Sequence, residues 1–125
     1  MGPEAKLYKK LRKSCKDISW IRIENISSLG TPDLLGYNTL GHFFTVELKV
    51  TKGNKVRFSP HQIAFHKTHP NHTFILVEAL GQRSSKLFYL IPGSRIDELV
   101  ACGLSKLDAC SLTLDACCLK FQNLN

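Results

Sequence analysis

The 125-residue sequence predicts an α/β fold in which helices flank a mixed central β-sheet. Three observations predict it. Residues 43–50 alternate apolar and polar side chains, as a strand does, and residues 73–79 form a nearly continuous apolar run typical of a central strand. Between them, Ser59-Pro60 is a helix-start signal. A strand, a helix and a strand in succession imply a right-handed crossover, which makes the two strands parallel within a mixed sheet.

The elements before residue 43 can be assigned in order. A helix is predicted over residues 4–16, where Leu7, Leu11 and Cys15 recur every four residues. Residues 20–25 alternate weakly and predict the first strand, and residues 33–37 predict the second. Gly36, Asn38 and Gly41 mark a hairpin turn into the strand over 43–50. In the loop before residue 33, Gly30 would let a backbone or a substrate come close.

The rest of the chain continues the pattern. Residues 51–57 form a basic loop, and the Ser59-Pro60 helix follows it. After the strand over 73–79, the chain turns at 81–85, and an outer strand is predicted over 86–91. Pro92-Gly93-Ser94 opens a helix that runs to about Cys102. We expect one domain, with a core over 1–103 and a helical C-terminal extension over 104–125 that finishes the core or forms a dimer contact.

The amino-acid composition narrows the range of possible functions. Seventeen Lys and Arg against ten Asp and Glu give a formal net charge of +7, which favours polyanionic partners, although any single lysine is more often a solvated surface residue. No run reaches the 18 apolar residues of a membrane span, and the N-terminus carries lysines where a signal peptide has an apolar core. We therefore expect a soluble, cytoplasmic protein with no membrane partner.

The cysteines and histidines do not suggest a metal site. Five cysteines, an odd number without paired Cys-x-x-Cys spacing, favour reduced thiols over a disulfide scaffold or structural zinc. Four histidines lie within residues 61–72, but their spacing gives no consistent ligand pair. We interpret them as surface or DNA-facing residues, one of which could assist proton transfer.

The residues that carry chemistry are Asp33, Glu47 and Lys49. Strand alternation places Glu47 and Lys49 on one face, and the hairpin pairs the strand of Asp33 with theirs. Two carboxylates and one backbone carbonyl would suffice to hold Mg²⁺, and Lys49 could orient a water or offset charge on a phosphoryl group. The alternative is a half-buried strand with a solvated polar face.

Thr31-Pro32-Asp33, followed after thirteen residues by Glu47-Leu48-Lys49, resembles the signature of the PD-(D/E)XK nuclease superfamily. With Ser59-Pro60-His61-Gln62 downstream, the pattern is most similar to the VRR-NUC and archaeal-type Holliday-junction-resolvase branches. The resemblance implies a restriction-endonuclease-like αβββαβ core. It also implies that Leu48 lends its backbone carbonyl to the metal, and that Glu4 binds the metal or its water. Gln62 would hydrogen-bond a catalytic residue or the substrate.

The main hypothesis is an endonuclease dependent on Mg²⁺ or Mn²⁺ that cuts DNA, with branched DNA or a Holliday junction preferred by analogy and a homodimer as a possible assembly. The residues chosen for DNA contacts are Lys52, Lys55, Arg57, Arg22 and His61. One alternative is a catalytically idle nuclease fold that serves as a DNA-binding or assembly module. Another is a basic, cysteine-rich structural protein, which would leave the pairing of Glu47 with Lys49 unexplained.

Overall fold

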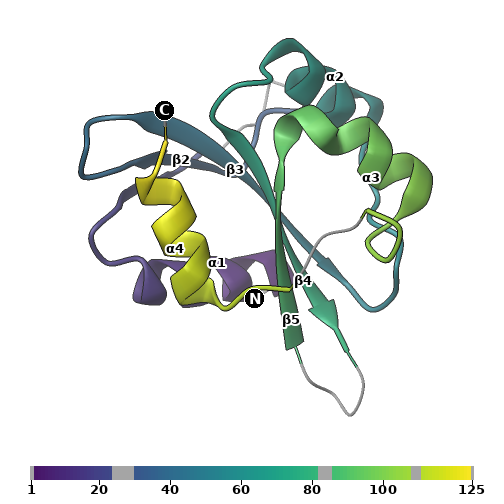
Figure 1. Ribbon diagram of the computed structural model, residues 1–125, viewed down its shortest axis with the longest axis horizontal. Coiled ribbons are helices and arrows are strands. Elements are labelled where there is room, and N and C mark those ends of the chain that lie inside the picture. Colours follow the sequence, from purple (N-terminus) through teal and green to yellow (C-terminus); the bar gives the residue numbers. More distant parts are fainter. Residues whose placement is uncertain (1, 24–29, 82–85, 108–110, 125) are drawn as a thin grey trace.

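The computed structural model describes residues 2–23, 30–81, 86–107 and 111–124. Within these ranges five strands form one sheet in the order β1-β2-β3-β4-β5. The strands are β1 (Ser19–Arg22), β2 (Leu34–Tyr37), β3 (Phe43–Thr51), β4 (Thr73–Leu80) and β5 (Lys86–Pro92). The helices are α1 (Pro3–Ser14), α2 (Pro60–Thr68), α3 (Ile96–Cys102) and α4 (Leu114–Gln122), and a short 3₁₀ turn, η2 (Gly93–Arg95), precedes α3. Figure 1 shows α1 and α4 on one side of the sheet and α2 and α3 on the other.

The predicted mixed sheet is confirmed. β3 and β4 pair in parallel, while the β1–β2, β2–β3 and β4–β5 pairs are antiparallel. The bounds of β2 to β5 agree with the predicted strands to within about two residues. Of the predicted first strand, residues 24 and 25 lie outside the described residues, and β1 ends at Arg22.

The face of the sheet under α1 and α4 carries the larger hydrophobic core. Phe44 and Val46 of β3 point to this face, where they meet Leu7 of α1. Phe121 of α4 is fully buried, and its ring stacks on Phe44 with 4.7 Å between the ring centroids. The C-terminal helix therefore completes this core, because its aromatic side chain fills the space beside α1.

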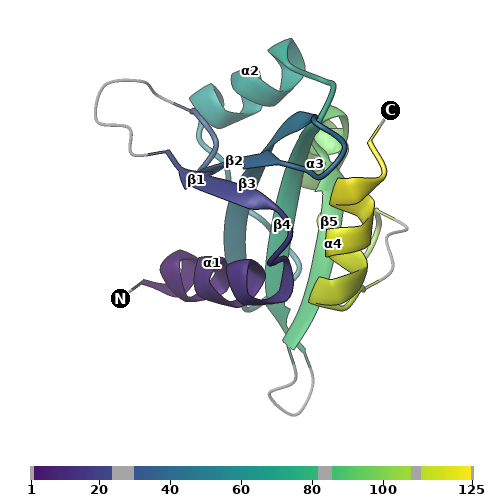
Figure 2. The same ribbon diagram turned by 90° about the vertical axis from the view of Figure 1, so that its left-hand side faces the viewer.

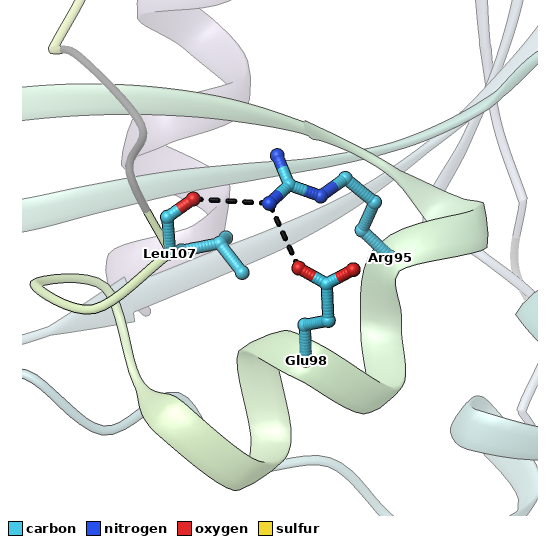
Figure 3. Close-up of polar contacts among 3 residues, drawn as sticks. All are labelled: Arg95, Glu98 and Leu107. Atoms are coloured by element: carbon cyan, nitrogen blue, oxygen red, sulfur yellow. Dashed lines mark hydrogen bonds and ion pairs between the residues drawn. The ribbon is translucent and has the colours of Figure 1, made fainter.

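The opposite face is covered by α2 and α3. Ile75 and Ile91 of the sheet pack with Ile96 of α3 in a second buried cluster. Figure 3 shows how the chain after α3 is held: the Arg95 guanidinium donates to the Glu98 carboxylate at 2.8 Å and to the Leu107 backbone carbonyl at 3.0 Å. This side chain links the start of α3 to the turn that follows it.

The expectation of five reduced thiols is wrong for two of them. Cys15, just after α1, and Cys118, in α4, form a disulfide with 5.4 Å between their Cα atoms. Among the described residues, Cys102 and Cys117 are free thiols, and Cys110 lies outside the described residues. Sequence spacing could not reveal the pair, because 103 positions separate two cysteines that only the packing of α4 against α1 brings together.

In the ranges that the structure describes, no helix combines the length and the apolar character needed to cross a membrane.

Candidate active site

Asp33 and Glu47 meet where β2 begins. The β2–β3 register pairs Leu34 with Val46, so Asp33, one residue earlier, comes opposite Glu47, one residue later. An oxygen of the Asp33 carboxylate accepts a 2.8 Å hydrogen bond from the backbone N–H of Leu48. Because the N–H and C=O of a strand residue point to the same side, the Leu48 carbonyl is directed toward Asp33 as well.

Gln62 of α2 connects the groups of this site. Its amide nitrogen donates to Glu47 at 3.3 Å, and its amide oxygen accepts from the Lys49 ammonium at 3.1 Å. The same oxygen accepts from the backbone N–H of Ser59, whose hydroxyl caps the helix in return. This reciprocal capping box fixes the Gln62 side chain and therefore its bonds to Glu47 and Lys49.

Lys49 is held from a second direction. Its ammonium lies 4.8 Å from the centroid of the Phe58 ring, within the range of a cation–π contact. The lysine is half-buried, between the ring and Gln62, on the same face of β3 as Glu47.

Glu47 is the strongest electrostatic anomaly in the described part of the site. Burial, and then the neighbouring Asp33 carboxyl group, raise the pKa of Glu47 to about 9, with Lys49 acting in the opposite direction and Glu4 adding a smaller increase. The side chain is 3 % exposed, and its Oε1 atom is buried without a hydrogen-bond partner among the residues that the structure describes. Two carboxyl groups are thus held together in a place that only a cation or a proton can neutralise.

The residues fit a hard divalent cation. In the described residues no three His, Cys, Asp or Glu side chains are grouped as a complete metal site. Mg²⁺ does not need such a group, because it keeps several waters and commonly uses one or two carboxylates. Asp33, Glu47 and the Leu48 carbonyl form this kind of partial oxygen set, and the unpartnered Glu47 oxygen is an acceptor that an ion would satisfy.

A cavity of about 400 Å³ adjoins the site at Lys49, and its described lining includes neither Asp33 nor Glu47. It brings together five of the residues singled out from the sequence. They are Glu4, Lys49, Lys52, Lys55 and Arg57. Glu4, in the first turn of α1, is exposed instead of facing the core, so it reaches the cavity from the helix end. The charged residues that line the cavity are therefore four cations and one acid, Glu4.

Two other sequence-predicted residues stand apart. Arg22 of β1 pairs in register with Leu34, whose side chain lies in the core under α1, and the Arg22 guanidinium is 6.0 Å from the ring centroid of Tyr8. It therefore lies on the face opposite Glu47, because the side chain of a strand residue alternates between faces. His61 is exposed in the first turn of α2.

The expectation that all four clustered histidines face solvent or DNA is wrong for His66. It is fully buried on the covered side of α2, neither ring nitrogen has a hydrogen-bond partner in the described part of the chain, and burial lowers its pKa to about 4. The ring is therefore neutral at ordinary pH. Its place at the covered side of α2 was not visible from spacing, because that short helix has no clear apolar stripe.

Gly30, in the loop before Asp33, lies close to another part of the backbone, as the sequence predicted. Gly30 has a φ of +85°, and a Cβ there would collide with the backbone of His61 and Gln62. Only glycine adopts this conformation without strain and leaves room for the helix start. Gly30 therefore lets the loop that carries Asp33 pack against the end of α2 that carries Gln62.

Neutralising Glu47 is expected to stabilise the metal-free protein at high pH. The folded chain holds a proton on Glu47 up to a pKa of about 9, whereas an unfolded glutamate releases it near its ordinary pKa of 4.5. Folding therefore takes up a proton across this window, and the contribution of Glu47 to the free energy of unfolding falls as the pH rises from about 4.5 to 9. Glu47→Gln should raise the free energy of unfolding at pH 8 by roughly 2 kcal/mol and flatten its fall with pH.

Urea denaturation at pH 5 and pH 8 in EDTA measures both effects. Asp17→Asn, which neutralises an exposed carboxylate outside the site, is the matched control. A Glu47→Gln variant that is less stable than the unchanged protein at pH 8 would show that the carboxylate pair is not strained.

Comparison with known proteins identifies a solved structure with a similar fold. No family model and no curated protein sequence matches the chain. A solved structure does: Archaeoglobus fulgidus Hjc, a Holliday junction resolvase from an archaeal hyperthermophile, with a TM-score of 0.50 and 18 % sequence identity over 72 % of this chain and 74 % of that chain. The fold resembles that of this resolvase.

The likeness to this resolvase supports the α/β, restriction-endonuclease-like fold that the motif order implied, with its mixed sheet and flanking helices. At 18 % identity it concerns the fold alone. The VRR-NUC branch gains no support from it.

Proposed function

We propose that this chain is an endodeoxyribonuclease dependent on Mg²⁺ or Mn²⁺, which hydrolyses phosphodiester bonds in DNA. One observation carries the proposal: the unpartnered, buried oxygen of Glu47 beside Asp33, with Lys49 held by Gln62 on the same side of β3. Holding the buried Glu47 carboxyl group beside the half-buried Asp33 costs stability, and a cation offsets that cost in the working enzyme.

Asp33, Glu47 and the Leu48 carbonyl would hold the metal ion, and Glu4 would approach from α1. When bound, the ion supplies Lewis-acid chemistry toward the phosphodiester and its nucleophile. Gln62 keeps the Glu47 carboxylate and the Lys49 ammonium in place through its two bonds. A rigid pair of this kind needs no rearrangement as charge develops.

Lys49 acts on the scissile phosphate and on the attacking water. Its ammonium, positioned by Gln62 and Phe58, orients the water and offsets negative charge that builds on the phosphoryl oxygens. The lysine can do so because it is half-buried and restrained, whereas a free surface lysine would be mobile and hydrated.

The DNA backbone would lie over the cavity beside Lys49. Lys52, Lys55 and Arg57 line it and are exposed, so they can contact phosphates. These cations, together with the formal charge of +7, compensate for bringing a polyanion up to acidic side chains. His61 is exposed on α2 and remains a proposed contact, while Arg22 would require DNA to reach the other face of the sheet.

Branched DNA, with a Holliday junction as the leading case, is the substrate that we propose. The support is analogy to the resolvase fold. A homodimer would suit a junction, because two symmetric cuts need two sites. A cytoplasmic setting and a place in the VRR-NUC branch belong to the same proposal and rest on the sequence pattern.

The competing proposal is a nuclease fold that binds DNA without cutting it. A binding module has no need for Asp33, Glu47 and Lys49 to lie close together. The unpartnered Glu47 oxygen would then lower the stability of the protein without serving its function.

A cleavage panel separates the two. Purified protein is incubated with a four-way junction, a flap, a splayed arm, linear duplex and single-stranded DNA, with Mg²⁺, Mn²⁺, Ca²⁺ or EDTA. We expect cleavage of a branched substrate with Mg²⁺ or Mn²⁺ and none in EDTA or with Asp33→Ala. Tight junction binding without cleavage under any metal would establish the binding module instead.

A further inference from the structure

A second cavity lies on the face of the sheet that α1 covers. Its volume is about 300 Å³. We call it the lysine pocket and define it by five charged residues from α1, the end of β3, β4 and the start of β5. They are Lys6, Lys10, Lys52, Glu78 and Lys86.

Glu78 is the buried anchor of the lysine pocket. In β4 it pairs in register with Val50, so its side chain points toward α1, and it is 5 % exposed. The Lys10 ammonium donates to its carboxylate at 2.6 Å. A carboxylate in the middle of an otherwise apolar strand costs desolvation energy, which this ion pair offsets. One lysine of the pocket is therefore already neutralised by the protein.

Among the described residues that line the pocket, Lys6, Lys52 and Lys86 have no acidic partner of their own. Lys86 lies close enough to Lys10 that the second ammonium lowers the pKa of Lys86, and Lys6 lowers it further. Glu78 acts in the opposite direction but is already shared with Lys10. Four lysines around one glutamate leave a net charge of +3 among the lining residues, so like charges are gathered where an anion would relieve their repulsion.

The lysine pocket shares lining residues with the cavity of the candidate active site. Val50, Thr51 and Lys52 line both, at the end of β3. The N-terminal half of α1 also borders both, since Glu4 lines the active-site cavity and Lys6 lines the pocket. Figure 2 shows α1 running along this side of the sheet, with its N-terminus at the edge of the molecule. An extended anion can therefore pass from one cavity to the other over Lys52.

We propose that the lysine pocket binds backbone phosphates of the DNA strand that continues past the scissile phosphate. This inference rests on the proposed function, which supplies the strand. Lysine ammoniums are point charges without the planar fork of arginine, so they suit phosphate contacts that position a backbone without reading bases. The pocket would thus hold the strand in register with Glu47 and Lys49 regardless of its sequence.

The test is the salt dependence of DNA binding by Lys6→Ala/Lys86→Ala. Lys10 is left in place because Glu78 needs it. Fluorescence anisotropy with labelled duplex and four-way junction, in EDTA, gives the dissociation constant from 50 to 200 mM KCl. Loss of two phosphate contacts should reduce the slope of log K against log salt by about 1.8 on duplex DNA. Lys106→Ala/Lys120→Ala, which removes two exposed lysines elsewhere, is the matched control and should change the slope by less than about 0.5.

Three results decide the proposal. A slope for the pocket variant equal to that of the control, with both variants folded by circular dichroism, overturns it. Inorganic phosphate that binds the unchanged protein but not the pocket variant, without any change in DNA slope, would assign the pocket to a small anion and also overturn it. The expected loss of slope on both DNAs supports it.

The experiment can reject phosphate binding by the lysine pocket without rejecting the proposed nuclease function, and the reverse is also true. Binding is measured without divalent metal, so a reduced slope stands even if no DNA is ever cut. Conversely, metal-dependent cleavage together with an unchanged slope would leave the proposed function intact and remove the pocket alone.

Discussion

Replacing Lys49 with alanine is expected to slow metal-dependent DNA cleavage by roughly 10²–10³-fold, because the variant loses a restrained cation beside the reacting phosphate. The effect should fall on the rate at saturating DNA, since Lys49 is half-buried between Gln62 and the Phe58 ring and is not a surface phosphate contact. Single-turnover cleavage of the preferred branched substrate in Mg²⁺ measures it.

Lys106→Ala removes an exposed lysine elsewhere and controls for the change in net charge. The thermal midpoint of Lys49→Ala should stay close to that of the unchanged protein, because Ser59 still caps α2 and Gln62 still bonds Glu47. Cleavage by Lys49→Ala at the rate of the control would remove the lysine from the mechanism and favour the binding module.

Reducing the Cys15–Cys118 disulfide is expected to lower the free energy of unfolding by about 2–4 kcal/mol. The bond joins α4 to the end of α1 and closes a loop across 103 positions, so the unfolded chain gains freedom when it is broken. Both cysteines pack against the same core as Phe121, so the loosened helix should also expose apolar surface.

Urea denaturation with and without a phosphine reductant measures the loss. Cys15→Ala/Cys118→Ala should reproduce the reduced protein and ignore the reductant, while Cys102→Ala, which changes an exposed free thiol, should behave like the unchanged protein. Alkylation of both Cys15 and Cys118 in non-reduced protein, read by mass spectrometry, would show that the thiols remain reduced, as the sequence alone suggested.

The two faces of the sheet carry different features of this protein. One face, under α2, presents Glu47 and Lys49 to Gln62. The other, under α1 and α4, carries the larger core and, at one edge, the lysine pocket. The end of β3 joins them, because Lys52 lines the cavities on both sides. A DNA strand that follows these cations would therefore pass around the end of β3.

The sequence determined where the helices and strands lie. It also determined that Asp33, Glu47 and Lys49 come close together. Both follow from short-range physics: side-chain alternation puts Glu47 and Lys49 on one face, and a hairpin turn brings the start of β2 beside them. Gln62 was also accessible, since Ser59 and Pro60 fix where its helix starts and so which residue occupies the third position.

Only the tertiary structure decided how deeply Glu47 is buried, that Arg22 lies on the opposite face, and that His66 lies inside. It also decided the disulfide and the grouping of Lys86 with the lysines of α1. These features depend on which surfaces meet after the chain has travelled tens of residues. Local sequence periodicity does not predict which elements pack together, because the same alternating strand can be covered by a helix or left open to water.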